Sequence, residues 1–220
     1  MEETIHINVE IRKTEDGAVS ISTNRLWPSL LRFTLRTMYS PIKGDILQGA
    51  CLTIINNLAL VVEGFMTDLI VNEIQRSEKS IEFNPEKSTW GNKKKIYSKI
   101  FKKPLSEYPE YGAIEILFLL RNNVAHGRSH LEIQKKKKLE DEWDNLTSDN
   151  KNYQKVREYL VKNKLLEQKT IPSNVDWLWQ GHVASFFCMH VESFLASIIK
   201  DLDEQQTMGI SGEFKTACLR

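Results

Sequence analysis

A long run of apolar residues at helical spacing is the feature that most constrains this fold. From about Pro41 onwards, apolar side chains recur at steps of three and four residues. The members of the run are Ile46, Ala50, Ile54, Leu58, Val61, Val62, Met66, Leu69, Ile70 and Ile74. Pro41 stands just before the start, and Asp45 falls in the first turn. We therefore expect one helix of about 30 residues, and helices of that length usually line a bundle.

Two more apolar segments complete the expected helical core. Residues 111–126 are apolar nearly all round, which predicts a central helix, and Gly127 directly after them favours a helix stop. Residues 175–204 carry a wide apolar face and predict the last core helix. A short basic helix is expected over 92–102, with Ile96, Ile100 and Phe101 facing inward. The sequence thus predicts a mostly α fold, a helical bundle.

The remaining segments predict additions to this bundle. Residues 4–23 alternate as strands do, with a turn signal at 15–17, and predict a short N-terminal β-hairpin that ends at Trp27-Pro28. We accordingly divide the chain into an N-terminal β-ribbon appendage (1–40), a helical domain (41–204) and a C-terminal tail (205–220) that lacks a clear pattern. A charged helical insertion at about 131–170, with a break near 148–150, belongs to the helical domain.

Charge is distributed unevenly although the net charge is only +1. Residues 87–138 hold 13 Lys or Arg against 4 Asp or Glu, a local charge of +9, and the rest of the chain carries −8. Such a basic block suggests an anionic partner such as RNA, and a solvated lysine face is the alternative. The candidate RNA-binding residues are Lys93, Lys94, Lys95, Lys99, Arg128 and His130.

Cysteine usage and hydropathy point to a soluble cytoplasmic protein. Cys51, Cys188 and Cys218 have no metal-ligand spacing, so we expect reduced thiols and neither a metal nor a cofactor. The first residues are acidic and no apolar signal segment follows them. Polar residues such as Glu63 and Glu115 interrupt the longest apolar stretches, and none reaches the roughly 18 clean residues of a membrane helix.

Polar residues appear abruptly at the end of the central apolar helix. The segment reads Leu119-Leu120-Arg121-Asn122-Asn123-Val124-Ala125-His126-Gly127. A buried arginine is costly unless it is paired or functional, and a helix C-terminus favours a protonated imidazole. Asn122 and His126 share a helix face, whereas Arg121 lies about 140° from His126 on an ideal helix. A second copy of the helix, related by two-fold symmetry, would make a pocket readily.

A structural role for these residues is the alternative. Arg121 would then bond helix-end carbonyls or a nearby glutamate, and His126 would cap the helix. Glu63 stands in mid-helix among apolar neighbours and is a candidate partner for Arg121.

Arg121-Asn122, followed after three residues by His126 and then Gly127, resembles the Arg-x4-6-His signature of the HEPN superfamily. The resemblance covers about residues 43–204 in architecture and 121–127 in motif. It implies a helical bundle with the motif near the end of one core helix. Many HEPN proteins are ribonucleases of toxin–antitoxin, abortive-infection or CRISPR-linked defence systems, and many act as dimers. The resemblance therefore implies a homodimeric endoribonuclease with a possible antitoxin or defence-system partner protein.

The resemblance also implies a role for each motif residue. His126 would act as general base or acid on an RNA 2′-hydroxyl, Arg121 would hold the scissile phosphate, and Asn122 would orient His126 or a phosphate oxygen. The products would be a 2′,3′-cyclic phosphate and a 5′-hydroxyl, and no metal is required. One toxin subgroup, paired with nucleotidyltransferase antitoxins, has a tyrosine two residues after the histidine. Arg128 stands at that position here, which argues against that partner.

Two other interpretations remain open. Some HEPN bundles are non-catalytic RNA-, nucleotide- or protein-binding modules, in which Arg121 and His126 would form a residual anion site. The other is a purely structural α-bundle. RNA binding without turnover would favour the first of these, and the absence of any RNA phenotype would favour the second.

Overall fold

The structure is a computed structural model that describes residues 9–13, 19–23, 25–40, 45–77, 81, 83–85, 87–125, 132–133, 147–148, 151–166, 181–207 and 209–219. This part of the chain is mostly helical. Its helices are α1 (Trp27–Met38), α2 (Asp45–Ser77), α3 (Trp90–Phe101), the 3-10 turn η1 (Leu105–Glu107), α4 (Tyr111–Ala125), α5 (Lys151–Lys162), α6 (Gly181–Asp201) and α7 (Ile210–Cys218). Strands β1 (Val9–Lys13) and β2 (Val19–Thr23) pair antiparallel, as do β3 (Glu132–Ile133) and β4 (Thr147–Ser148).

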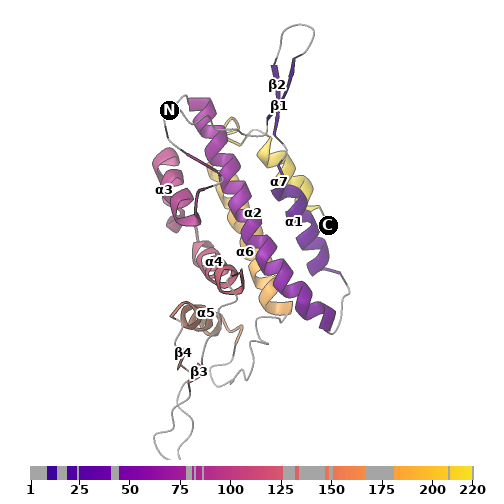
Figure 1. Cartoon of the computed structure of the whole chain (residues 1–220), viewed down its shortest axis with the longest axis vertical. Helices are drawn as coiled ribbons and strands as arrows, with labels where there is room; N and C mark the ends of the chain where they lie inside the picture. The colour runs from indigo at the N-terminus through magenta and orange to yellow at the C-terminus, as the bar shows by residue number, and fades with distance from the viewer. Residues whose placement is uncertain are drawn as a thin grey trace, which may run out of the picture.

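The long helix α2 is the centre of the bundle. It packs against α6, with α1 and α7 on one side and α3 and α4 on the other, while α5 lies against α4 (Figure 1). Its 33 residues confirm the predicted long helix, and α4 confirms the predicted central one. Leu58, Val62, Met66, Leu69 and Ile70 on α2 are fully buried, as the apolar spacing predicts. The expected all-helical core is therefore present.

Helix α1 departs from the proposed division at residue 40. Trp27 and Pro28 do not merely end a ribbon, because Pro28 stands in the first turn of a helix that packs on α2. Trp27, Leu31 and Leu35 are each at most 3% exposed. Their spacing of four residues places them on one face, so α1 belongs to the bundle core rather than to an appendage.

Helix α7 lies within the expected tail at 205–220, where the sequence shows no clear pattern. Ile210 and Ala217 are buried, and α7 packs on α1. Gly209 precedes the helix with φ +76°, a conformation that costs glycine little. Arg25, which donates to Glu213 at 3.2 Å and contacts Asp68 at 3.3 Å, joins α7 to α2. The last helix is thus held by both packing and charge.

The charged insertion is helical only in part. Glu132–Ile133, where helix was expected, pairs antiparallel with Thr147–Ser148, which lies at the expected break. Residues 134–146 lie outside the described chain. Helix α5 follows and packs on α4 through its buried Val156 and Leu160. The insertion therefore covers part of the central helix.

Two glycines of α2 are expected to respond oppositely to alanine. A Cβ at Gly64 would lie 2.9 Å from the Trp27 Cβ, whereas a Cβ at Gly49 would meet nothing within 4 Å. Gly49→Ala is expected to stabilise the protein by about 0.5–1 kcal/mol, because alanine is the better helix former. Gly64→Ala is expected to destabilise it by about 1–3 kcal/mol, because α1 must move away from α2. Urea unfolding of both variants measures these changes, and a stabilising Gly64→Ala would contradict the close α1–α2 packing.

Two helices meet the length and hydropathy of a membrane span, although no such stretch was expected from the sequence. Gly49–Ser77 and Gly181–Asp201 are long and apolar enough to cross a membrane by length and composition, with mean hydropathy of 1.6 and 1.4 in their most apolar stretches. About half of each stretch is buried inside the bundle, where α2 and α6 pack on one another. The core helices of a soluble protein pass the same test of length and composition, so it does not separate the two settings.

Candidate functional site

Arg121 lies about one turn before the end of α4, and its side chain reaches Glu63 in the middle of α2. Its Nη2 atom is 2.8 Å from Glu63 Oε2, which confirms the pairing that the isolated Glu63 suggested. The two side chains are 25% and 19% exposed, so solvent screens their attraction only in part. The guanidinium also lies over the Phe118 ring at 5.5 Å, and the Arg121 Nε is buried without a hydrogen-bond partner among the described residues. Arg121 is therefore held in place but retains unused donors.

Lys93 stands next to this ion pair rather than on the outer face of α3. It is 6% exposed, although sequence reasoning grouped it with the surface lysines. Burial lowers the pKa of Lys93, the positive charge of Arg121 adds to that, and the charge of Glu63 opposes it. Lys93 lies three residues before Ile96 and four before the buried Tyr97, a spacing that places it on the inner face. This helical spacing is the feature of the sequence from which the burial of Lys93 could have been predicted.

Lys93, Arg121 and Glu63 form what we call the Arg121 cluster, contributed by three helices. It contains two basic side chains against one carboxylate. When the Lys93 amine is protonated, the cluster carries a net positive charge in a partly desolvated environment. Partial desolvation strengthens its attraction for an anion relative to that of a fully exposed lysine.

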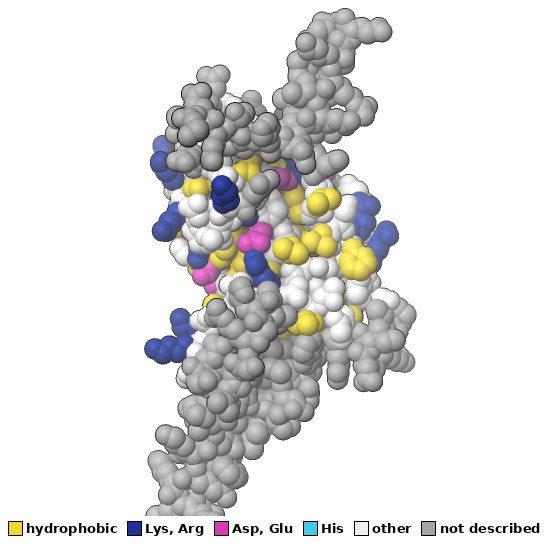
Figure 2. Space-filling model, viewed as in Figure 1, with side chains coloured by type: hydrophobic (Ala, Val, Ile, Leu, Met, Phe, Trp, Pro, Cys, Tyr) yellow, Lys and Arg dark blue, Asp and Glu magenta, His cyan; other side chains and the backbone are white. Residues whose placement is uncertain are grey.

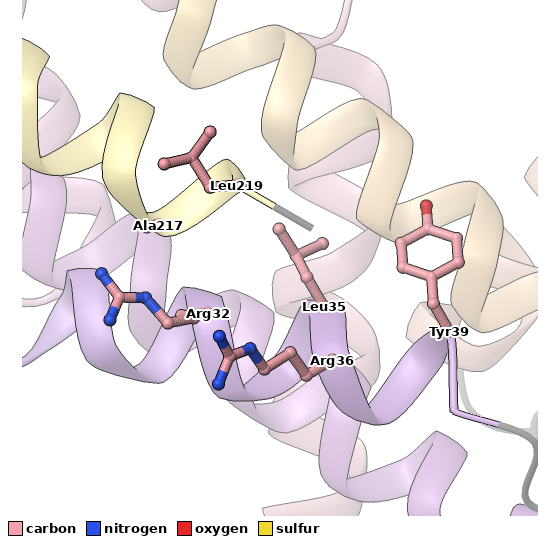
Figure 3. Close-up of a pocket in the computed structure, with 6 residues that line it drawn as sticks. All are labelled: Arg32, Leu35, Arg36, Tyr39, Ala217 and Leu219. Atoms are coloured by element: carbon pink, nitrogen blue, oxygen red, sulfur yellow. The ribbon is translucent and has the colours of Figure 1, made fainter.

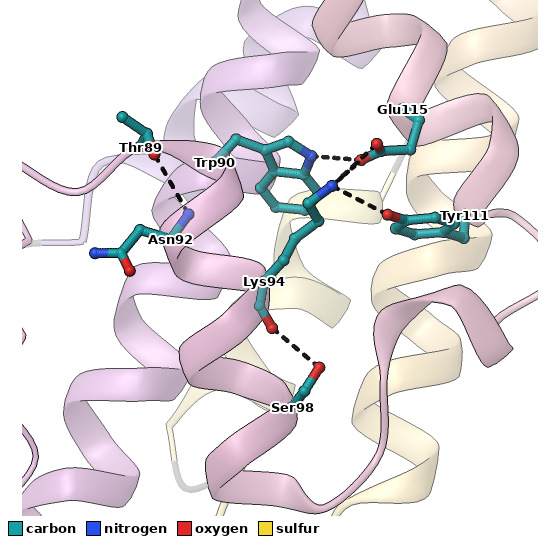
Figure 4. A network of polar contacts seen from close by, with 7 residues as sticks. All are labelled: Thr89, Trp90, Asn92, Lys94, Ser98, Tyr111 and Glu115. Carbon is teal, nitrogen blue, oxygen red and sulfur yellow. Dashed lines mark hydrogen bonds and ion pairs between the residues drawn. The ribbon is translucent and has the colours of Figure 1, made fainter.

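A second set of contacts fixes α3 against α4 (Figure 4). Trp90 stacks on Phe118 at 4.2 Å and donates from Nε1 to Glu115 Oε1 at 2.7 Å. Lys94 Nζ lies 3.0 Å from both Glu115 oxygens and 3.1 Å from the Tyr111 hydroxyl. Burial lowers the pKa of Lys94, but the hydrogen bonds to Tyr111 and Glu115 outweigh it, so the net shift is upward. Phe118 also lies under the Arg121 guanidinium, so the contacts between α3 and α4 help to fix the position of Arg121.

The other proposed site residues divide into exposed ones and ones outside the described chain. Lys95, Lys99 and Asn122 are exposed. Lys and Arg side chains lie over α3 in the space-filling view (Figure 2). His126, Arg128 and His130 lie outside the described residues, so their proposed roles stay predictions. Arg121 and Lys93 are brought together, whereas Lys94 is turned to Glu115.

The two histidines of α6 have local partners. His190 Nδ1 lies 2.8 Å from the Phe186 carbonyl of its own helix, and its ring lies 3.9 Å from that of Phe186. His182 is exposed, with Nε2 3.0 Å from the Leu165 carbonyl. In the part of the chain that the structure describes, no three His, Cys, Asp or Glu side chains gather as metal ligands would.

Taken together, the described geometry suits the holding of an anion at the end of α4. A fixed guanidinium with spare donors, beside a buried amine, binds a phosphate or carboxylate better than mobile surface cations do. A phosphate there would compete with, or share the guanidinium with, Glu63. No protein-family model matches the chain, and no curated protein or solved structure matches it significantly.

Proposed function

We propose that this protein is a metal-independent endoribonuclease of the HEPN type, which cleaves RNA by attack of the 2′-hydroxyl. The observation that supports the proposal most is the placement of Arg121, anchored by Glu63 beside Lys93 at the end of α4. Arg121 and Lys93 would hold the scissile phosphate, and Arg121 would stabilise the charge that builds on its oxygens. His126 would transfer the proton, with Asn122 beside Arg121 to orient it.

The proposal includes the assembly and setting implied by the same motif. Two copies would meet at the end of α4, so that motif residues of both protomers face one RNA strand. The exposed Lys95 and Lys99 would add contacts to the RNA backbone. A cytoplasmic toxin or anti-phage role, with an antitoxin or defence-system partner protein, completes the proposal.

RNA cleavage in EDTA is the direct test. Purified protein is incubated with total RNA, and we expect fragments that end in 2′,3′-cyclic phosphates and begin with 5′-hydroxyls. His126→Ala is expected to abolish cleavage, because general acid–base catalysis contributes roughly 100- to 10,000-fold. The matched control is His190→Ala, since His190 bonds its own helix backbone. Equal cleavage by wild type and His126→Ala would refute the proposed chemistry.

A non-catalytic binding module is the second candidate, and the Glu63–Arg121 ion pair favours it. Glu63 already bonds the guanidinium and offsets part of its charge, so Arg121 has less charge left to stabilise a transition state than a free arginine would have. This module would bind RNA or a nucleotide with the same cluster but would not cleave it. Binding that weakens in Arg121→Gln, with no cyclic-phosphate product from wild type, would decide for it.

Replacement of Lys93 is expected to change stability and RNA binding in opposite directions. Because burial and Arg121 lower its pKa, the protonated amine costs stability at neutral pH. Lys93→Met is therefore expected to raise the free energy of unfolding at pH 7, with the gain shrinking as the pH rises toward 10.5, the ordinary lysine value. The same variant is expected to weaken RNA binding. Unfolding curves at pH 7 and pH 10, with RNA titrations, measure both effects, and unchanged RNA affinity would remove Lys93 from the site.

A further inference from the structure

A pocket of about 210 Å³ lies between α1 and the C-terminal helix α7 (Figure 3). Its lining residues are Arg32, Leu35, Arg36, Tyr39, Ala217 and Leu219. None of them belongs to the Arg121 cluster, and α1 is a helix that the proposed RNA chemistry does not use. The pocket therefore needs an explanation of its own.

Its charge is positive. Arg32 and Arg36 lie one helical turn apart and extend from α1 on the same side (Figure 3). Among the described residues, no acidic side chain lines the pocket, and Arg32 Nε is buried without a hydrogen-bond partner. Two neighbouring guanidinium groups repel one another unless an anion lies between them. A carboxylate or phosphate matches their planar pairs of donors.

The rest of the pocket is apolar. Leu35 and Ala217 are buried at its floor, and Leu219 is 69% exposed at its edge. An apolar cavity of about 150 Å³ holds a benzene molecule, so a pocket of this size suits a chain of about six carbons or a single ring. A ligand that lies there would cover Leu219, one of the most exposed large apolar side chains of the described chain.

We propose that this pocket binds a small organic anion. Its carboxylate or phosphate monoester group pairs with Arg32 and Arg36, and its short apolar body packs on the leucine side chains. Neither a bare inorganic anion nor an uncharged chain fills both halves of the pocket. The site is independent of the proposed ribonuclease activity, since the two share no residue.

Titration of the full chain with matched probes tests this assignment. The probes are hexanoate, hexyl phosphate, hexanol and inorganic phosphate. Their binding is measured by calorimetry or by changes in amide chemical shifts. We expect hexanoate or hexyl phosphate to bind at least tenfold more tightly than hexanol and inorganic phosphate, and comparison of the first two tells which anionic group is preferred. Arg32→Gln and Arg36→Gln are each expected to weaken binding at least tenfold. Lys215→Gln, which removes an exposed cation of α7 outside the pocket, is the matched control.

Several results would overturn the proposal. They are hexanol binding as well as hexanoate, inorganic phosphate binding as well as hexyl phosphate, and arginine variants that bind like wild type. Because Arg32 is partly buried, Leu219→Asn provides a second variant at an exposed position, and it too must weaken binding of the six-carbon probes. If single-stranded RNA displaces the probe, and does so equally well from Arg121→Ala, the pocket binds RNA and not a small organic anion.

Discussion

Arg121→Ala is expected to lower the rate of RNA cleavage at least about 100-fold, the usual effect of removing one donor to the charge that develops in a transition state. The guanidinium is fixed by Glu63 at 2.8 Å and lies over Phe118, so its remaining donors are aimed before RNA arrives. Arg121→Lys keeps the charge but loses the planar donors. We therefore expect an intermediate loss. Single-turnover cleavage of a defined RNA, with product ends identified, measures all three proteins.

The control must separate lost chemistry from lost stability. Removal of Arg121 also leaves Glu63 unpaired, which costs about 1–3 kcal/mol for a partly buried group. Arg76 makes a comparable ion pair on α2, the helix that also carries Glu63. Its bonds to Glu73, which is 3% exposed, are 2.9 and 2.8 Å long. Arg76→Ala should thus cost similar stability and leave cleavage unchanged. If Arg121→Ala cleaves like wild type, or if both variants lose activity in proportion to stability, Arg121 is structural.

The core of the bundle was predictable because its signal is local. The steps of three and four residues in α2 determine which side faces inward, and the polar residues that interrupt this face stand out. Glu63 was for that reason a candidate partner for Arg121, and the ion pair exists. Glu63 and Arg121 are 58 positions apart, so their contact depends on how α2 packs on α4. The apolar periodicity of each helix does not predict that packing.

The errors came from signals that were present but were given the wrong meaning. Pro28 was taken as the end of a ribbon, although proline is common in the first turn of a helix and apolar residues follow it at steps of four. Lys93 was grouped by charge with Lys94 and Lys95, although its spacing to the apolar residues of α3 places it inside. Charge runs describe composition, whereas the helix period decides which member of a run is buried.

Trp27→Ala is expected to destabilise the protein by about 3–5 kcal/mol, the range for loss of a large buried aromatic side chain. Trp27 is 3% exposed and packs edge-on against Phe65, with ring centroids 5.3 Å apart. Its Nε1 donates to Asp68 Oδ2 at 2.7 Å, and Gly64 of α2 leaves room for its Cβ. Trp27→Phe keeps most of the apolar contact and loses the hydrogen bond, so about 1–2 kcal/mol is expected. Urea unfolding followed by far-UV circular dichroism gives both values.

Phe33→Ala is the matched control, because Phe33 lies on the same helix and is 57% exposed. Its removal is expected to change stability by less than about 0.5 kcal/mol. If residues 1–40 were an appendage, Trp27→Ala and Phe33→Ala would both leave the unfolding of the bundle unchanged. A large effect of Trp27 alone instead requires α1 to unfold together with α2. The α1–α7 pocket would then be formed by elements of the cooperative core, since α7 packs on α1.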